Sequence, residues 1–477
     1  MDRRKFIISS ACFAALGRRE YAAPTKVSGQ PRSLSLRVDP SKTLGTIAPD
    51  FVGLGYEISS VARPGLLSAR NSTYIQYVNS LGTSGVVRVG GNTSDYSRYS
   101  KDGPSVSSPK ATVVNEAMIR DLAGFLETTG WQLIWGLNLG AGTMENAIEE
   151  ARSVVASAKD KLLAIEIGNE PDIFAGVHRP RGYGYSDYLR EYRVYKAALR
   201  DRIPNIPLAG PDVAVHTDWL TQFASDEGTD LRLLTHHYYA EGPPQSGAST
   251  IENLLQQPGD SLVRALKQCD SASHQANIPY RICETNSCFG GGKPGVSDTF
   301  ASALWGLDFL FTLAAGNSAG ADLQTGVNQL GFISSYSPIG EDERGNYIAK
   351  PLYYGMLAFT QASRGSKIAL DYEQSGMNLK AYGVKDPAGR LFVTIINKEA
   401  LMDASLSLAI PVRSGRGSVM RLTGPSLDSK SGVTLGGSMV SSDGKWAPAH
   451  EELVPVQRGE CQVHLPAASA AILMFTQ

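Results

Sequence analysis

Residues 163–172 read LAIEIGNEPD, and this stretch decides the fold. Its first five residues, Leu163–Ile167, are mostly apolar and predict a buried strand, and a polar run from Asn169 to Asp172 follows directly. The same unit, a short apolar strand followed by a helical pattern, recurs before and after it along the chain. We expect a sheet of parallel strands connected by helices, because alternating strands and helices form that arrangement.

Eight such strands are predicted between residues 51 and 324. They are Phe51–Ile58, Gly85–Val89, Gln132–Leu139, Leu163–Ile167, Pro207–Ala209, Arg232–His236, Tyr280–Cys283 and Gly320–Gln324. Helical patterns separate them, for example at Asn115–Thr129, Ser186–Asp201, Ser261–Ala272 and Thr299–Ala315. This alternation predicts an α/β fold with a (β/α)8 TIM barrel over residues 49–362. A doubly wound sheet is the alternative, but no Gly-x-Gly-x-x-Gly turn follows an early strand.

The chain changes character after about residue 365, where the helical period ends. Short strands with Gly, Ser and Asp turns predict a second, smaller β-sandwich domain over residues 363–477. Its predicted strands are Leu379–Val384, Leu391–Ile396, Ala404–Leu408, Ser418–Leu422, Gln462–Leu465 and Ala470–Phe475. A strand at 35–39, within the segment 35–48, has no helix to follow it, and we expect it to join the sandwich.

The N-terminus has the features of an export signal. Arg3 and Arg4 precede the short apolar run Phe6–Leu16, and small residues stand at Ala22 and Ala23. Residues 1–23 therefore predict a twin-arginine-like signal, with an ordinary Sec signal as the alternative, and residues 24–34 predict a flexible segment. We expect a bacterial protein that acts in the periplasm or outside the cell.

Composition excludes several classes of protein. The 477 residues include 45 Lys and Arg against 46 Asp and Glu, which gives a net charge of −1. A nucleic-acid-binding protein needs a basic surface, so we expect no nucleic-acid partner. After the signal, no segment is long and apolar enough to span a membrane. The cysteines match no zinc pattern, and we expect neither a metal nor an organic cofactor.

Two glutamates stand where predicted barrel strands end. Glu170 follows strand four and Glu284 ends strand seven. Active sites of such barrels lie at the carboxyl ends of the strands. A retaining glycosidase needs two carboxyl groups there, one to protonate the leaving oxygen and one to attack the anomeric carbon. Either glutamate alone would be read as a helix cap or a solvated loop residue, but the pair in this setting favours that chemistry.

Several motifs extend the comparison to a family. They are VRVGGN at 87–92, IGNEPD at 167–172, AGPDV at 209–213, HHYY at 236–239, and ETNS at 284–287 followed by three glycines at 290–292. Together they resemble glycoside hydrolase family 79, the β-glucuronidases and heparanases. The Asn-Glu-Pro motif is shared by a wider clan of barrel glycosidases, whereas the later motifs are narrower.

The resemblance implies roles for individual residues. Glu170 would be the acid/base and Glu284 the nucleophile, and Tyr239 would donate a hydrogen bond that holds the nucleophile ionised. His237 would line the pocket, with a packing role as the alternative, and Arg88 would form an inner salt bridge to a site carboxylate. Residues expected to hold sugar hydroxyls are Glu57, Asn92, Asn169 and, on spacing alone, Asn138.

Recognition of a uronic acid requires groups for the C6 carboxylate. The resemblance implies the backbone amides of Gly290 and Gly291, which are suited to form an anion-binding nest, together with Tyr336. The family commonly has a tyrosine where this chain has Phe289. We expect an exo-acting β-glucuronidase whose partner is a glucuronic-acid-containing glycan or glycoconjugate. The alternatives are a heparanase-like endo-β-glucuronidase, a neutral-sugar β-glycosidase and a non-catalytic carbohydrate-binding protein.

Overall fold

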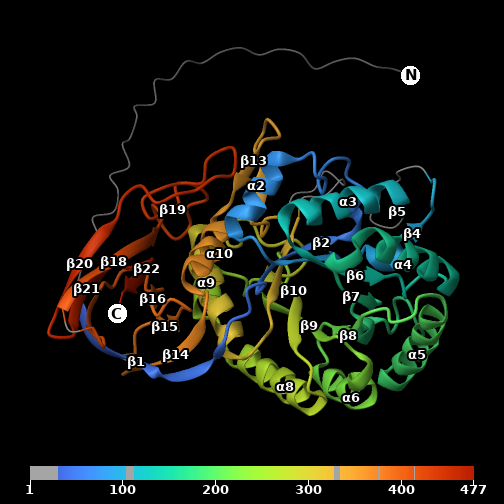
Figure 1. Ribbon diagram of the computed structural model, residues 1–477, viewed down its shortest axis with the longest axis horizontal. Helices are drawn as coiled ribbons and strands as arrows, with labels where there is room; N and C mark the ends of the chain where they lie inside the picture. Colours follow the sequence, from blue (N-terminus) through green and yellow to red (C-terminus); the bar gives the residue numbers. More distant parts are fainter. Residues whose placement is uncertain (1–30, 104–111, 327–333, 374–375, 413, 477) are drawn as a thin grey trace, which may run out of the picture.

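The computed structural model describes residues 31–103, 112–326, 334–373, 376–412 and 414–476. Figure 1 shows a barrel wrapped by helices beside a smaller domain made of strands. The predicted export signal at 1–23 lies outside the described residues. In the parts described, no helix is both long and apolar enough to cross a bilayer.

Eight parallel strands close the barrel, as the sequence predicted. In chain order they are β2 (Val52–Glu57), β3 (Val86–Gly90), β6 (Gln132–Leu137), β7 (Leu162–Ile167), β8 (Leu208–Val213), β9 (Leu233–Glu241), β10 (Tyr280–Cys288) and β11 (Ala321–Thr325). The ring closes where β11 pairs with both β10 and β2. The carboxyl ends of all eight strands therefore meet at one rim, where their following loops gather.

Helices follow each of the barrel strands and cover the barrel. The longer ones are α2 (Ser72–Leu81), α3 (Glu116–Thr129), α4 (Met144–Ala158), α5 (Tyr185–Arg202), α6 (Thr217–Glu227), α8 (Asp260–Ala276), α9 (Phe300–Ala315) and α10 (Pro351–Ala362), with short helices α1 (Ile58–Val61) and α7 (Ile251–Gln256). Helix α3 shows how local sequence sets the ends. The Asn115 side chain accepts the Met118 N–H at its start, and Gly130 ends it in a left-handed conformation.

The smaller domain is one continuous sheet that closes on itself, rather than two separate sheets. Its order is β18 (Ser414–Thr423), β20 (Glu452–Gln457), β21 (Glu460–Leu465), β17 (Ala404–Ala409), β1 (Arg32–Thr46), β14 (Ser366–Tyr372), β15 (Leu379–Lys385), β16 (Leu391–Asn397) and β22 (Ser469–Phe475), and β22 pairs back with β18. The short strand β19 (Thr434–Leu435) pairs with β18 and adds one more strand to the sheet. Alternating side chains fill the interior, which explains the period-two pattern in the sequence.

Strand β1 crosses from the barrel side into the middle of this sheet, between β17 and β14 (Figure 1). The expected N-terminal strand is confirmed, but it begins at Arg32, inside the segment predicted to be flexible. Strands β14 and β20 were not predicted. Short additional strands lie outside both bodies: β4 (Arg98–Tyr99) pairs with β5 (Val113–Val114), and β12 (Ile339–Glu341) pairs with β13 (Tyr347–Ala349).

A buried ion pair stands at the amino-terminal end of the barrel. Arg281 on β10 donates from Nη2 to Asp322 on β11 at 2.8 Å and from Nε to its other oxygen at 2.9 Å. The Arg281 guanidinium also reaches the Phe51 carbonyl. This end of the barrel is thus closed by its own charge pair, far along the strands from the rim.

Helix α9 joins the two bodies. Fourteen of its sixteen residues are buried, and its Phe311 ring stacks on Tyr382 of β15, with ring centres 4.7 Å apart. One charged residue on this helix, Asp308, accepts hydrogen bonds from Lys398 Nζ at 2.6 Å and from the Tyr382 hydroxyl at 2.5 Å. Both members of the Asp308–Lys398 pair are almost fully buried.

Replacing Asp308 with Asn should therefore destabilise the junction between the bodies. The change leaves a buried ammonium without its anion, an effect that costs ~3–5 kcal/mol in comparable pairs. We expect a lower midpoint in urea unfolding followed by tryptophan fluorescence. The double variant Asp308→Leu with Lys398→Met should recover most of the loss, whereas Asp443→Asn, in an exposed pair, should leave the midpoint unchanged.

Candidate active site

The two predicted glutamates face each other at the carboxyl rim. A Glu170 oxygen, a Glu284 oxygen and a ring nitrogen of His237 all lie within 4.8 Å of one another. Glu170 follows β7 after a turn in which Gly168 and Glu170 itself adopt positive φ angles of 86° and 53°. Glu284 lies within β10. Strands on opposite sides of one barrel therefore present two carboxyl groups to the same small space.

Glu284 is held by two donors. The Tyr239 hydroxyl on β9 donates to Glu284 Oε1 at 2.8 Å, and Arg88 Nη1 on β3 donates to Glu284 Oε2 at 2.6 Å. The Glu284 side chain is 8% exposed. Each carboxylate oxygen thus accepts a hydrogen bond from its own donor.

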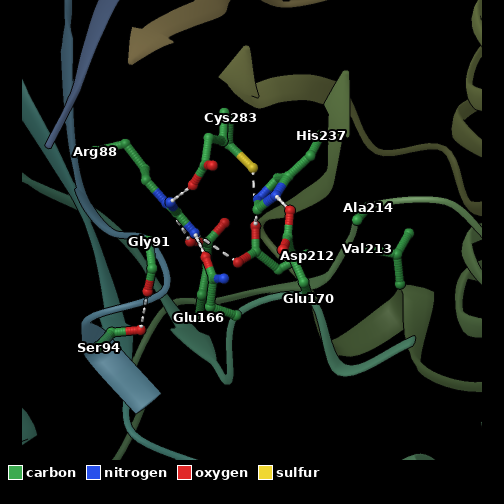
Figure 2. Close-up of polar contacts among 12 residues, drawn as sticks. Arg88, Gly91, Ser94, Glu166, Glu170, Asp212, Val213, Ala214, His237 and Cys283 are labelled. Carbon is green, nitrogen blue, oxygen red and sulfur yellow. Dashed lines mark hydrogen bonds and ion pairs between the residues drawn. The ribbon is translucent and has the colours of Figure 1, made fainter. Parts of the chain in front are cut away.

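Arg88 is the hub of the buried charges (Figure 2). Besides Glu284, its guanidinium contacts Glu166 on β7 at 3.1 Å, the Asn169 side-chain oxygen at 3.0 Å and Asp212 on β8 at 2.6 Å. The expectation of an inner salt bridge from Arg88 to a site carboxylate agrees with these contacts. One buried cation thus links four neighbouring side chains.

Glu170 faces a histidine that is itself held by a carboxylate. His237 Nδ1 lies 3.0 Å from Glu170 Oε1, and His237 Nε2 lies 2.8 Å from Asp212 Oδ1. Burial raises the pKa of Glu170, and the hydrogen bond and charge of His237 oppose that rise. The pKa of His237 is raised well above its ordinary value by the surrounding anions, chiefly Asp212, despite burial.

The buried carboxyl groups around Arg88 differ in their pKa. Arg88 and His237 hold the pKa of Asp212 below the ordinary range against the effect of burial, so Asp212 is ionised. Burial, with the Asp212 charge, raises the pKa of Glu166 to about 8. Arg88 and His237 both face the Asp212 carboxylate. A site of this kind keeps one carboxyl group protonated beside an ionised one.

Three further predicted residues line the same rim. Glu57, at the end of β2, accepts the Thr93 N–H and hydroxyl, each at 2.8 Å, and burial with the nearby Glu284 charge raises its pKa to about 7. Asn169 donates to the exposed Asn92 side chain at 3.3 Å. These groups surround the two glutamates from loops after β2, β3 and β7.

Asn138 differs from its expected role. Its side-chain nitrogen donates to the Ser97 carbonyl at 2.7 Å, and its oxygen accepts the N–H groups of Ala141 and Gly142. The amide is buried and committed to the loop backbone, so it is not presented to a ligand. Its position at a strand end correctly predicted that Asn138 lies at the rim. Spacing along the sequence does not show which groups form hydrogen bonds with its side-chain amide.

The glycine loop and Tyr336 come together near Glu284. Gly290, Gly291 and Gly292 all have positive φ, and the Ser335 N–H donates to the Gly291 carbonyl at 2.7 Å. A Cβ at Gly292 would stand 2.6 Å from the Tyr336 nitrogen, so the close approach requires glycine there. The Tyr336 ring centre lies 6.3 Å from that of Tyr239.

Sequence reasoning assigned no role to Asp212, Glu166 or Cys283. Cys283 directly precedes Glu284 on β10, and its Sγ lies 2.9 Å from Asp212 Oδ1. A signal was present for Glu166, since a charged residue inside the apolar run LAIEI must find a buried partner. Asp212 stood in a noted motif, but only the fold shows that β8 directs it between Arg88 and His237.

Two sets of side chains have ligand-type atoms close enough to share a cation: Asp212 with His237 and Cys283, and Glu170 with His237 and Glu284. In the first set, the Asp212 oxygen lies 2.8–2.9 Å from the other two atoms. Such separations are hydrogen-bond lengths, with a proton between the atoms. Burial also raises the pKa of the Cys283 thiol, which disfavours the thiolate that a metal needs.

The chain has a (β/α)8 barrel with two facing carboxyl groups at its rim, beside a β-domain. These features place it in the structural class of the barrel glycoside hydrolases. Residues 378–472 match the family model for the glycosyl hydrolase family 79 C-terminal beta domain. This match bears out the resemblance to glycoside hydrolase family 79 that the motifs indicated.

The chain is similar to named relatives in sequence and to a solved structure in fold. The chain is 28% identical to a β-glucuronidase of Aspergillus niger over 64% of this chain and 61% of that one, so it spans less than two thirds of that relative. It is 25% identical to mouse heparanase over 52% and 47% of the two chains. The fold matches a 4-O-α-L-rhamnosyl-β-D-glucuronidase from Fusarium oxysporum with a TM-score of 0.78, at 20% identity and 93% and 100% coverage.

Replacing Arg88 with Met should make stability fall more steeply as pH rises. In the natural protein, the lowered pKa of Asp212 stabilises the fold above its unfolded-state pKa, so this contribution is complete at both pH 5 and pH 8. Without Arg88, buried anions face one another, so folding favours their protonated forms and the variant should lose stability as pH rises. Urea midpoints at pH 5 and pH 8 measure this effect.

The surface variant Arg120→Met, which removes an exposed helix pair, serves as the control and should follow the natural protein at both pH values. An Arg88→Met protein that loses no more stability between pH 5 and pH 8 than the natural protein does would contradict the role of Arg88 as the main counter-charge.

Proposed function

We propose that this protein is a retaining glycoside hydrolase that releases terminal β-linked glucuronic acid. The observation that carries the proposal is the short separation, within 4.8 Å, between a Glu170 oxygen and a Glu284 oxygen. Retaining glycosidases have carboxyl groups about 5–5.5 Å apart, whereas inverting ones need about 6.5–9.5 Å to admit a water molecule. The β-glucuronidase names of the Aspergillus niger and Neurospora crassa relatives support the choice of sugar.

The chemistry proceeds by double displacement. Glu284 attacks the anomeric carbon as the glycosidic bond breaks, and Glu170 gives its proton to the leaving oxygen. Glu170, now a carboxylate, takes a proton from water, and the resulting hydroxide displaces Glu284 to release the sugar with its β configuration. The steps need no metal or organic cofactor, since each proton and electron pair moves between substrate, water and the two glutamates.

The surroundings of each glutamate suit its role. Arg88 and the Tyr239 hydroxyl stabilise the negative charge of Glu284, the attacking group. Burial raises the pKa of Glu170, which favours the protonated form that a general acid requires. Asn169, Asn92 and Glu57 lie on the same rim and would hold the sugar hydroxyls, with interactions at the 2-hydroxyl strengthening in the transition state.

The C6 carboxylate of the sugar would be bound by the glycine loop and Tyr336. Glycines carry no side chains to cover their N–H groups, and successive backbone N–H groups are suited to bind an anion. Tyr336 adds a hydroxyl from the next loop. An exo-acting enzyme is favoured over a heparanase-like endo enzyme because the rim loops carry scattered rather than clustered arginines, such as Arg63, Arg179 and Arg181. Export through residues 1–23 stays a prediction.

The test is hydrolysis of p-nitrophenyl β-D-glucuronide beside the matching glucoside, galactoside and xyloside, with the product anomer identified by NMR. We expect preference for the glucuronide and a β product. Glu284→Gln should lower kcat by ~10⁴-fold or more, because the attacking oxygen is lost. Glu170→Gln should lower the rate of hydrolysis most for substrates with poor leaving groups. The loss should be least for the substrate that releases 2,4-dinitrophenol, which departs without a proton.

Glu150→Gln is the matched control, because Glu150 is a buried glutamate bonded to Trp135 on the outer side of the barrel. It should leave the rates unchanged. Preference for a neutral sugar would overturn the glucuronide assignment, and an α product would overturn the retaining mechanism. Binding without turnover would indicate a carbohydrate-binding protein, and cleavage of only polymeric substrate would indicate an endo enzyme.

Phe289 offers a test of the carboxylate site alone. Its ring is 46% exposed and stands edge-on to Tyr239, with centres 6.3 Å apart. Phe289→Tyr adds a hydroxyl beside the glycine loop, so we expect KM for the glucuronide to fall by ~3–10-fold, the effect of one hydrogen bond. KM for the glucoside should not change, and Phe289→Leu should bring no gain. An equal gain for both sugars would contradict this location for the carboxylate.

A further inference from the structure

Asp212 touches the supports of both glutamates but has no place in the chemistry described above. Its Oδ2 accepts Arg88 Nη2 at 2.6 Å, and Arg88 in turn contacts the nucleophile. Its Oδ1 lies 2.8 Å from His237 Nε2, and His237 in turn contacts the acid/base. Figure 2 shows Asp212 between Arg88 on one side and His237 on the other. The Asp212 side chain is 1% exposed, so solvent does not replace these partners.

The backbone of Asp212 supports the same arrangement. The Glu170 N–H donates to the Asp212 carbonyl at 2.9 Å, so Asp212 holds the acid/base through its main chain as well as through His237. Asp212 adopts φ of +61°, a conformation that costs energy in a residue with a Cβ. Such a conformation persists where surrounding contacts determine it, and these positions cluster at functional sites.

The carboxylate of Asp212 fixes which nitrogen of His237 faces Glu170. An ionised carboxylate can only accept a hydrogen bond, so His237 Nε2 carries a hydrogen toward Asp212. Nδ1 then points at Glu170, either accepting the Glu170 proton or, when the ring is charged, donating to the Glu170 carboxylate. These are the two states that an acid/base passes through in a retaining reaction.

We propose that Asp212 is a positioning residue that couples the two glutamates: it holds His237 against Glu170 and Arg88 against Glu284 through one carboxylate. The inference rests on the proposed glycosidase function. It goes beyond that function because it gives a new role to Asp212, which touches neither sugar nor water. Asp212 would control the pH range over which Glu170 holds its proton.

The expected change in the charge of His237 follows from the groups around its ring. The charged or titratable neighbours are Arg88 from β3, Glu166 and Glu170 from β7 and its loop, Asp212 from β8, His236 and Tyr239 from β9, and Cys283 and Glu284 from β10. Of these, Asp212 is the anion in direct contact with Nε2. Its removal should return His237 to the neutral form, because burial then dominates.

Asp212→Asn is the test, with kcat/KM for an aryl glucuronide measured across pH. Glu170 loses the cation beside it and keeps its proton to higher pH, so the basic limb should move up by about one unit or more, as expected for the loss of an adjacent charge. The rate at the optimum should fall by ~10–100-fold, since Glu170 and Glu284 are less well held. His237→Gln, with no charge on the ring position, should move the same limb in the same direction even if Asp212→Asn does not fold.

Asp322→Asn is the matched control, because Asp322 is also a buried aspartate paired with a buried arginine, at the opposite end of the barrel. It should lower stability without moving the basic limb. A limb that is unchanged in both Asp212→Asn and His237→Gln would overturn the inference, as would an equal shift in Asp322→Asn.

A second readout separates this inference from the proposed function. Side-chain ¹⁵N shifts of histidine report the charge and tautomer of each ring without substrate. We expect one ring that stays charged at pH 8 in the natural protein and becomes neutral in Asp212→Asn. If the natural protein hydrolyses no glucuronide, the proposed function fails; if this ring stays charged in Asp212→Asn, the coupling through Asp212 fails.

Discussion

The guanidinium of Arg88 is the interaction on which the rest of the site depends. It is a fully buried cation, and burying a charge is unfavourable unless partners surround it. Its partners come from three strands, Glu166 and Asn169 from β7 and its loop, Asp212 from β8 and Glu284 from β10, and they meet only because the barrel closes. The cation therefore ties the closure of the barrel to the geometry of the site, and a misplaced strand would leave several charges unpaired at once.

The same charges separate the behaviour of the two reacting glutamates. Glu284 faces two donors, whereas Glu170 faces a histidine whose charge depends on a third carboxylate. Water is largely excluded, so each contact acts in a medium of low polarity, where electrostatic effects are strong. Two identical side chains thus have different surroundings, which suit the opposite roles proposed for them.

The sequence predicted the barrel and both glutamates because these rest on local patterns. Apolar runs predict buried strands, and Glu170 and Glu284 follow such runs directly. Prediction from the sequence failed where the contacts of a residue depend on packing or on partners distant in the chain. Asn138 occupies the expected rim, yet its amide is bonded to loop backbone. Asp212 acquires its contacts only when β3, β8 and β9 are assembled. Strand β14 escaped prediction because its half-buried pattern alternates weakly.

Strand β1 has a consequence for how the chain folds. Its residue Arg32 pairs with Ala404, and Leu36 pairs with both Leu408 and Tyr372, so the sheet needs partners separated by more than 330 positions. The segment 378–472 that defines the family domain lacks β1 and β14 and would expose two unpaired edges. The domain is thus not an autonomous folding unit, and its last step waits for synthesis of nearly the whole polypeptide. The first strand made is among the last to find its place.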